Sequence, residues 1–384
     1  MKRTYEEINR KIEAKDAVVM TAEEVLGLIA SKGIEKATKE VDVVTTGTFG
    51  AMCSSGAFLN FGHSEPPIKM QHISLNGVAA YGGLAAVDAY IGATELRNDV
   101  DMNYGGAHVI EELVAGKAVH LKANSYCSDC YPRKEIDTYI SLKTINQAYL
   151  FNPRNAYQNY GLATNSSDKT LYTYMGKLLP HYGNVTYSSA GQLSPLLNDP
   201  FYWTIGTGTR IFLCGASGSV VSSGTQHNPG SRRGANGIPR EGSGTIAVMG
   251  NMKEMDPRFI RGASLTGYGC SIMIGIGIPI PILNKDLAYF TGLSDKDIFC
   301  QVVDYGSDYP SNSGRTLGEV SYAELKSGRI EFMGKTIETA PLSSYPMARK
   351  IAQLLREWIL RGYTLGVPQT TLSTVPYGRQ HETG

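Results

Sequence analysis

The chain has 384 residues, of which 42% are hydrophobic and 18% charged, enough apolar material for one large core or two ordinary ones. Its 36 basic and 35 acidic residues give a formal charge of +1, so no broad electrostatic field favours nucleic acid or an anionic membrane. Six cysteines in a chain of this length do not suggest a disulfide framework, and small molecules or other proteins are the expected partners.

The N-terminal thirty residues carry charges throughout and lack the apolar stretch that a secretory signal needs. A cytoplasmic location is therefore expected. The longest apolar stretch, residues 271–283, is interrupted by glycines and prolines and is shorter than the roughly 20 residues that span a bilayer. No membrane span is expected.

Short helices and a strand are predicted for the start of the chain. Two Thr-x-x-Glu patterns, beginning at Thr4 and Thr21, match capping boxes, so two or three helices are expected to open the fold. Residues 41–46 are rich in β-branched side chains and predict a strand that ends at Gly47. Cys53 is then expected just beyond a strand end, where α/β folds often place their chemistry.

The middle of the chain is predicted to be predominantly β and rich in loops. Between residues 136 and 281, short β-branched runs such as 210–213 and 244–249 alternate with segments of Gly, Asn, Ser and Pro. Near the C-terminus, apolar residues at helical spacing predict an amphipathic helix over about 345–361, with Pro346 near its start.

These elements predict a mixed fold class, α/β or α+β, with short N-terminal helices, a loop-rich β-containing core and a C-terminal amphipathic helix. No tandem repeat or linker-like composition divides the chain. Residues 1–362 are therefore expected to form a single catalytic unit, followed by a polar, frayed tail over 363–384.

Two cysteines lie in polar, turn-like surroundings. Cys53 is surrounded by glycines and hydroxyl side chains, and Cys130 is followed closely by Arg133 and Lys134. Backbone N–H groups and nearby cations favour a thiolate, so both cysteines are candidate nucleophiles. The competing interpretations are a buried cysteine at a tight turn for Cys53 and a solvated pair of surface cations beside Cys130.

The spacing of Cys127 and Cys130 matches a dithiol redox pair or half of a zinc site. No second CxxC or spaced histidine pair accompanies it, which disfavours zinc. A redox CxxC is expected at the start of a helix, where Pro132 would be tolerated, so a thiol–disulfide oxidoreductase stays open. The other three cysteines are expected to be structural, with a strand position for the first: Cys214, Cys270 and Cys300.

Histidines and arginines in loops supply further candidates. His63, His108 and His227 could each transfer a proton near neutral pH. Arg154 and Arg210 could each clamp a carboxylate, because a guanidinium matches a carboxylate in a bidentate pair. A structural hydrogen-bonding role is the alternative for all five. The glycine-rich stretch around Arg210 suggests an anion cradle, but it lacks the spacing of a nucleotide-binding motif.

Longer motifs follow one another from about Tyr5 to Trp358. They include TTGTFGAMCSSGAFLNFGHSEPPIKM, YGGAHVIEEL, DCYPRKEI, LFNPRNAYQNY, ATNSSDKTLYTYMG, GTQHNP and GIGIPIPILN. Motifs of this length in this order resemble the homocysteine biosynthesis family of anaerobic archaea and bacteria, the L-aspartate semialdehyde sulfurtransferases. The resemblance implies that inorganic sulfur is incorporated into aspartate semialdehyde to give homocysteine, with two electrons from a reductant.

The resemblance implies that Cys53 and Cys130 are the catalytic cysteines, and Cys130 is expected to carry the persulfide. The position of Cys127 is commonly glycine, so the CxxC looks like a local departure. The resemblance implies that the Cys130 persulfide attacks the aldehyde carbon, while Cys53 releases sulfur through a disulfide or forms a hemithioacetal. The candidates for a cation near a thiolate, a carboxylate ligand and a proton donor are, respectively, Arg133, Arg154 and His63.

The resemblance also implies partners. The substrates would be aspartate semialdehyde and either sulfide or a sulfane-sulfur donor. The sequence carries no cysteine-rich cluster motif, so no tightly bound cofactor or metal is expected, and electrons would come from a small ferredoxin-like iron–sulfur protein. Appended CBS or ferredoxin domains, present in some relatives, are not expected here, and a homo-oligomer is left open. If the protein is not an enzyme, the alternative function is that of a regulatory protein that binds a small molecule.

Overall fold

The computed structural model describes residues 3–97, 101–154, 158–307, 309–310 and 314–373. The mixed fold class is confirmed, and the largest element is one long sheet. Its strands are β3 (Thr48–Ala51), β4 (Gly56–Asn60), β5 (His72–Leu75), β6 (Val78–Tyr81), β7 (Asp88–Gly92), β8 (Leu96–Arg97), β9 (Asp101–Gly105), β10 (Val119–Asn124), β11 (Glu135–Ile140), β12 (Gln147–Asn152), β18 (Arg210–Leu213), β19 (Ala216–Ser223), β20 (Ile246–Asn251), β21 (Ile260–Leu265) and β22 (Gly269–Gly277).

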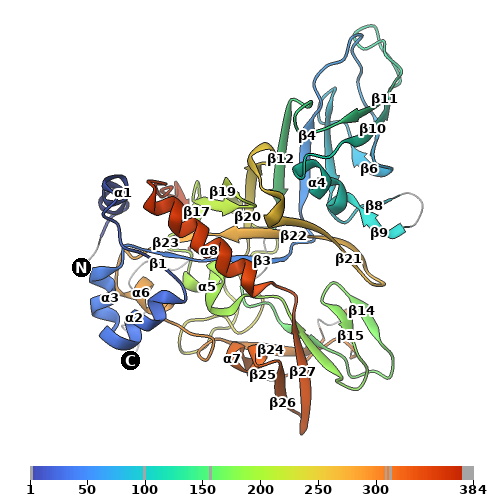
Figure 1. Cartoon of the computed structure of the whole chain (residues 1–384). Helices are drawn as coiled ribbons and strands as arrows, with labels where there is room; N and C mark the ends of the chain where they lie inside the picture. Colours follow the sequence, from blue (N-terminus) through green and yellow to red (C-terminus); the bar gives the residue numbers. More distant parts are fainter. Residues whose placement is uncertain (1–2, 98–100, 155–157, 308, 311–313, 374–384) are drawn as a thin grey trace.

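A second sheet forms the lower lobe of the molecule in Figure 1. Its strands are β13 (Leu162–Thr164), β16 (Asn184–Tyr187), β24 (Phe299–Asp304), β25 (Arg315–Ser321), β26 (Arg329–Phe332) and β27 (Lys335–Pro341). Three smaller groups complete the strands: β1 (Val19–Thr21), β2 (Val43–Thr45) and β23 (Pro279–Pro281); β14 (Leu171–Thr173) with β15 (Gly176–Leu178); and β17 (Gly206–Thr207) with β28 (Thr370–Thr371).

The helices lie mainly on the body of the molecule. They are α1 (Tyr5–Ala14), α2 (Glu24–Lys32), α3 (Ile34–Glu40), α4 (Gly106–Val114), α5 (Pro195–Asn198), α6 (Lys285–Thr291), α7 (Tyr322–Lys326) and α8 (Tyr345–Leu360), with the 3-10 turns η1 (Gly191–Leu193), η2 (Met252–Glu254) and η3 (Pro257–Phe259). No helix in the described part of the chain is long and apolar enough to cross a membrane.

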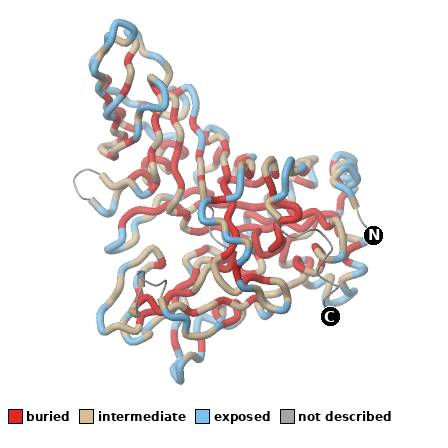
Figure 2. Tube along the Cα trace, turned by 180° about the vertical axis from the view of Figure 1, so that it is seen from behind, coloured by how far each residue is buried: buried red, intermediate tan, exposed pale blue. Residues whose placement is uncertain are grey.

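The long sheet connects two parts of the molecule: the body, which contains β18 to β22, and an upper lobe, which contains the strands from β4 to β11. Its main path runs β11-β10-β5-β6-β7-β4-β12-β20-β19-β18-β22-β21, and β3 pairs with β22. In Figure 1 the strands from β4 to β11 rise out of the body, while β18 to β22 lie within it. Figure 2 shows buried residues along the strands of the body and exposed residues at the far tip of the upper lobe. The upper lobe is thus an extension of the same sheet.

Local signals at the two ends of the chain are confirmed. The Thr4 hydroxyl accepts a bond from the Glu7 N–H at 3.2 Å, and the Thr4 N–H donates to the Glu7 carboxylate at 2.8 Å, which completes the capping box before α1. Helix α8 begins with Pro346 in its first turn and ends one residue before the predicted boundary. Such signals are readable because they involve residues three or four positions apart.

Helix α8 packs directly on β22 and β3, and glycines make this close approach feasible. A Cβ atom at Gly275 or Gly277 would come within 2.9 Å of the buried side chain of Ile351. The isoleucines that alternate with these glycines, including Ile274 and Ile276, are buried. The motif GIGIPIPILN therefore provides a strand that can be covered tightly by a helix.

One local expectation is confirmed and two need correction. Cys53 lies just beyond a strand end, although that strand is β3, which follows the predicted strand and Gly47. Cys214 lies at a turn between β18 and β19 with φ of 51°, and not in a strand. The described part of the tail is held in place, because the Leu365 N–H donates to Asn9 at 2.8 Å and β28 pairs with β17. Residues 374–384 lie outside the described residues.

Candidate active site

A cavity of about 310 Å³ opens beside Cys53, in the turn between β3 and β4. Its walls come from segments far apart in the sequence. Among the described lining residues, Arg154 carries a full charge, and tyrosines supply much of the remaining polar surface. The side chains that matter most for chemistry are Cys53, Arg154, Tyr160, Tyr174, Gln226 and Tyr268.

The sulfur of Cys53 lies among hydroxyl groups. Cys53 Sγ is 3.1 Å from Ser271 Oγ on β22, and Tyr268 lines the same cavity as Cys53. Partial burial, together with Cys53, raises the pKa of Tyr268 to about 12, so its phenol is neutral at physiological pH. A sulfur in this position has proton donors and acceptors within reach on the cavity side.

Arg154 is positioned by the turn that contains Cys53. Its backbone N–H donates to Asn152 Oδ1 at 2.9 Å, and its Nη2 donates to Ser54 Oγ at 3.0 Å. Buried Asn152 in turn donates to Ser55 Oγ at 3.0 Å, which links β12 to the same turn. A guanidinium has five N–H donors, so a carboxylate in the cavity could still be bound by the others.

A tyrosine cluster that sequence reasoning missed closes another side of the cavity. The hydroxyl of Tyr174 lies 2.6 Å from that of Tyr160, 2.9 Å from that of Tyr305 and 2.9 Å from that of Tyr309. Burial, reinforced by neighbouring hydroxyls, raises the pKa of Tyr174 well above its usual value. Two features of the sequence could have indicated this cluster: the large number of tyrosines, 23 in the chain, and the motif that contains Tyr174.

Cys130 lies elsewhere, exposed in the loop that joins β10 to β11. The ring of His63 stacks on that of Tyr131, with centroids 6.4 Å apart. The Arg133 N–H donates to Pro67 O at 3.2 Å, and its Nε donates to Glu135 O at 2.9 Å. His63 and Arg133 are therefore near Cys130, and the loop is packed against the segment that follows β4.

The structure does not bring Cys53 and Cys130 together. Strand β4 begins beyond the Cys53 turn and ends before the segment that contacts the Cys130 loop. Its five residues span on the order of 17 Å at about 3.4 Å per residue. None of the described residues of the Cys130 loop lines the cavity beside Cys53. The two cysteines thus belong to two separate sites within one chain.

The CxxC motif occupies a turn and not a helix. Cys127 has a φ of 61°, and Ser128 and Tyr131 exchange backbone hydrogen bonds at 3.1 and 3.0 Å. A left-handed φ is the conformation that glycine adopts most readily, which accounts physically for glycine at this position in the family pattern. Without a helix N-terminus, Cys127 and Cys130 lack the feature expected to stabilise a redox thiolate.

The remaining candidates have local partners. Arg210 Nη1 donates to the Thr364 hydroxyl at 3.1 Å and is not among the residues lining the Cys53 cavity. His227 Nδ1 lies 2.9 Å from the Thr245 N, and burial lowers the pKa of this histidine. Its neighbour Gln226 lines the cavity. His108 accepts a bond from the N–H of Gly105 at 3.2 Å, at the start of α4.

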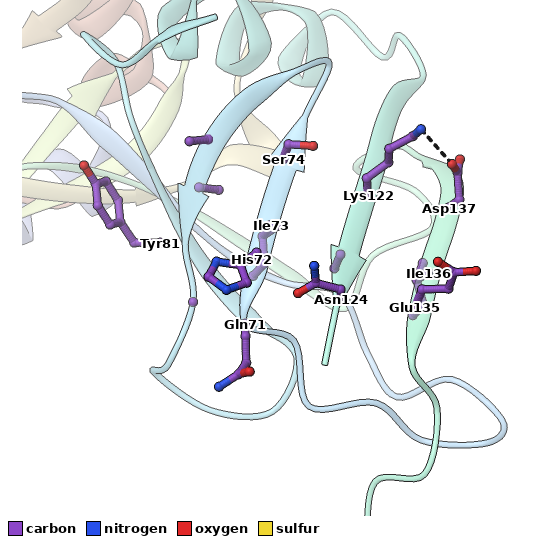
Figure 3. A pocket seen from close by; sticks show the side chains of 14 residues that line it. Gln71, His72, Ile73, Ser74, Tyr81, Lys122, Asn124, Glu135, Ile136 and Asp137 are labelled. Carbon is purple, nitrogen blue, oxygen red and sulfur yellow. Dashed lines mark ion pairs between the residues drawn. The ribbon is translucent and has the colours of Figure 1, made fainter. Parts of the chain in front are cut away.

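A larger cavity, about 680 Å³, lies on the open face of the upper lobe (Figure 3). It is lined by β5, β6, β10 and β11, and Lys122 Nζ lies 3.0 Å from Asp137 Oδ2 within it. None of its described lining residues is a cysteine. In the part of the chain that the structure describes, no group of three or more His, Cys, Asp or Glu side chains could hold a metal ion.

The fold and the site define a mixed α and β enzyme with a partly buried thiol in a tyrosine-lined cavity. The family model for homocysteine biosynthesis enzymes of sulfur incorporation matches residues 17–365. The chain belongs to this family.

Two relatives show how close the similarity is. An L-aspartate semialdehyde sulfurtransferase of Methanosarcina acetivorans is 53% identical over 374 residues, which cover 97% of this chain and 72% of the relative. One of the same name from Methanocaldococcus jannaschii is 51% identical over 375 residues, covering 94% of this chain and 71% of that protein. No solved structure matches the chain.

Proposed function

We propose that this chain is an L-aspartate semialdehyde sulfurtransferase that forms homocysteine in the cytoplasm. The aldehyde, hydrogen sulfide, two electrons and two protons give the thiol and one water. The cavity beside Cys53 carries the proposal, because a nucleophilic sulfur and a guanidinium face the same space. The relatives in two methanogens, named for this activity, support the choice of substrate.

Cys53 and Arg154 are proposed to bind the substrate. Arg154 would hold the carboxylate, and Cys53 would add to the aldehyde carbon as a hemithioacetal, or alternatively release sulfur through a disulfide. The partly buried position of Cys53 supports the first role, because a bound aldehyde would be shielded from bulk water. Gln226, at the cavity wall, offers a further hydrogen-bonding group.

Cys130 is proposed to accept sulfur as a persulfide. Its exposure supports this role, because a sulfane-sulfur donor can reach the thiolate directly, transfer one sulfur atom to it and leave as the reduced donor. Arg133 and His63 are the proposed cation and acid of this site, since both lie next to the same loop. Because the length of β4 and three further strands, β7, β6 and β5, separate the two cysteines, the Cys130 persulfide cannot attack an aldehyde at Cys53 in this arrangement. Sulfur must travel as released sulfide, after a rearrangement, or between chains.

The electrons are proposed to come from a ferredoxin-like iron–sulfur protein, and the chain itself is proposed to hold no tightly bound cofactor. Reduction of a carbon–sulfur intermediate needs two electrons. The exposed loop of Cys130 is a surface that a protein donor could approach. The chain is proposed to work in a reducing compartment, which suits its six free cysteines. Whether it acts as a homo-oligomer is best decided by measuring its mass in solution.

Anaerobic incubation with polysulfide, a sulfane-sulfur donor that can transfer one sulfur atom to a thiolate, followed by peptide mass spectrometry, tests the proposal. A gain of about 32 Da on Cys130, the mass of one sulfur atom, is expected. Homocysteine formation should be lost in Cys53→Ser and in Cys130→Ser but retained in Cys127→Gly, which is the matched control. Loss of activity in Cys127→Gly, together with an oxidised Cys127–Cys130 pair in the wild-type protein, would instead indicate a thiol–disulfide oxidoreductase. Ligand binding that is indifferent to alkylation of both cysteines would indicate a regulatory protein.

A further inference from the structure

We infer that Tyr268 is a catalytic residue of the Cys53 site, where its hydroxyl transfers a proton between the thiol and the oxygen of the aldehyde. This assignment rests on the function proposed above and adds a proton-transfer group to it. The position of Tyr268 in the cavity supports this role, although no sequence motif points to this tyrosine.

The turn between β21 and β22 directs Tyr268 toward the cavity. The Tyr268 N–H donates to Leu265 O at 3.0 Å, which closes the turn. Glycines flank the tyrosine on both sides, with φ of 69° at Gly267 and 122° at Gly269, values that L side chains rarely adopt. The ring of Tyr268 then packs edge-on against that of Tyr174, with centroids 6.2 Å apart. This backbone holds the phenol at the cavity wall.

Of the hydroxyls of Ser271 and Tyr268, only that of Tyr268 is placed to reach a substrate. Ser271 Oγ lies 3.1 Å from the sulfur, but its residue is fully buried and does not line the cavity. Tyr268 lines the cavity together with Cys53 and is 38% exposed, so its phenol and the sulfur face the same space. Arg154 lines the same cavity, so a substrate held by its carboxylate would extend toward the sulfur and the phenol.

A phenol in this position can act in both directions, because it is a donor and an acceptor. As the sulfur of Cys53 bonds to the aldehyde carbon, the carbonyl π electron pair moves to oxygen. The phenol proton of Tyr268 passes to that oxygen, and the thiol proton passes to the phenol oxygen. The product is the hemithioacetal with an unchanged tyrosine, so no net charge and no redox change is required. Neutral Tyr268 has the required proton at physiological pH.

The test is Tyr268→Phe, with Tyr289→Phe as the matched control. Tyr289 lies on α6, is half-buried against Phe290 and does not line the cavity. One readout is the rate at which iodoacetamide modifies Cys53 at neutral pH, resolved by peptide mass spectrometry. The other is kcat and KM for homocysteine formation from aspartate semialdehyde and sulfide with a chemical reductant.

In Tyr268→Phe, alkylation of Cys53 is expected to slow about tenfold, because the cavity loses the phenol that can donate a hydrogen bond to the sulfur as it reacts. The kcat is expected to fall about 100-fold with KM within twofold, as for loss of a general acid–base group. Tyr289→Phe should match the wild type in both. A wild-type value of either readout in Tyr268→Phe, or a loss that appears in KM alone, overturns the assignment. The alkylation result stands independently of the proposed reaction, which fails separately if Cys53→Ser remains active.

Discussion

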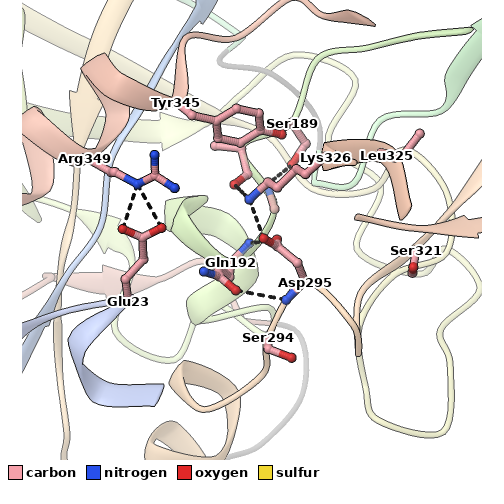
Figure 4. Close-up of polar contacts among 12 residues, drawn as sticks. Glu23, Ser189, Gln192, Ser294, Asp295, Ser321, Leu325, Lys326, Tyr345 and Arg349 are labelled. Atoms are coloured by element: carbon pink, nitrogen blue, oxygen red, sulfur yellow. Dashed lines mark hydrogen bonds and ion pairs between the residues drawn. The ribbon is translucent and has the colours of Figure 1, made fainter. Parts of the chain in front are cut away.

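The ion pair between Lys326 and Asp295 joins the end of α7 to the segment that follows α6 (Figure 4). Lys326 Nζ lies 2.5 Å from Asp295 Oδ2, and the side chains are only 18% and 13% exposed. Asp295 also accepts a bond from the N–H of Gln192 at 2.9 Å, which ties it to η1. Lys326→Met keeps most of the aliphatic stem but leaves the carboxylate without its cation.

Breaking a fully buried pair in this way costs about 3–5 kcal/mol. Because water reaches a small part of both side chains here, we expect Lys326→Met to lower the free energy of unfolding by about 2–4 kcal/mol. The midpoint of urea denaturation, followed by circular dichroism at constant slope, measures the change. Asp295→Asn combined with Lys326→Met should recover part of the loss, since no unpaired charge is then buried.

The same view contains a matched control. Arg349 Nε donates to both carboxylate oxygens of Glu23 at 3.0 and 2.9 Å, but these side chains are 50% and 31% exposed. Arg349→Met is therefore expected to cost less than about 1 kcal/mol. The reasoning about burial is refuted if Lys326→Met and Arg349→Met lower stability equally, or if the double variant is no more stable than Lys326→Met.

Three further predictions concern thiols, acid and packing. In the native protein, alkylation should reach exposed Cys130 early and spare Cys214 and Cys300 until unfolding, because burial raises the pKa of both thiols to about 12; peptide mass spectrometry over time gives the order. Burial lowers the pKa of His227 in the folded state, so the unfolded chain binds the proton more readily. Stability should therefore decrease as pH falls below about 6.5 toward the folded-state pKa, and His227→Gln should flatten that part of the curve of unfolding free energy against pH. At Gly47 a Cβ would lie 2.2 Å from a carbonyl oxygen of α8, so Gly47→Ala should destabilise by about 2–3 kcal/mol, measured by the urea midpoint.

The parts of the fold that could be predicted from the sequence are those specified by neighbouring residues. The Thr4 capping box, the strand over residues 210–213 and helix α8 each have a short-range signal. The same holds for the turn-like surroundings of Cys53, since glycines and hydroxyl residues next to it disfavour a regular element. The structure places Cys53 in such a turn.

The tyrosines around Cys53 could not be predicted in this way. Tyr160, Tyr174 and Tyr305 come from separate segments, yet their hydroxyls are hydrogen-bonded to one another. The ring of Tyr268, from a fourth segment, packs on that of Tyr174, and no local pattern specifies these contacts. In the sequence, Tyr268 lies between two glycines and is indistinguishable from an ordinary turn residue. Its chemical meaning depends on the sulfur that another part of the chain places beside it.

The distance between the two cysteines depends in the same way on the order of strands. Cys53 lies in the turn before β4, and Cys130 lies in the loop between β10 and β11. However, β4 and β10 are separated by β7, β6 and β5 in the sheet, and the two turns lie at opposite ends of these strands. Because the sheet between them is continuous and hydrogen-bonded, bringing the sulfurs into contact within one chain would require breaking several strand pairings. The separation of the two sulfurs therefore follows from the strand order, which no local pattern in the sequence specifies.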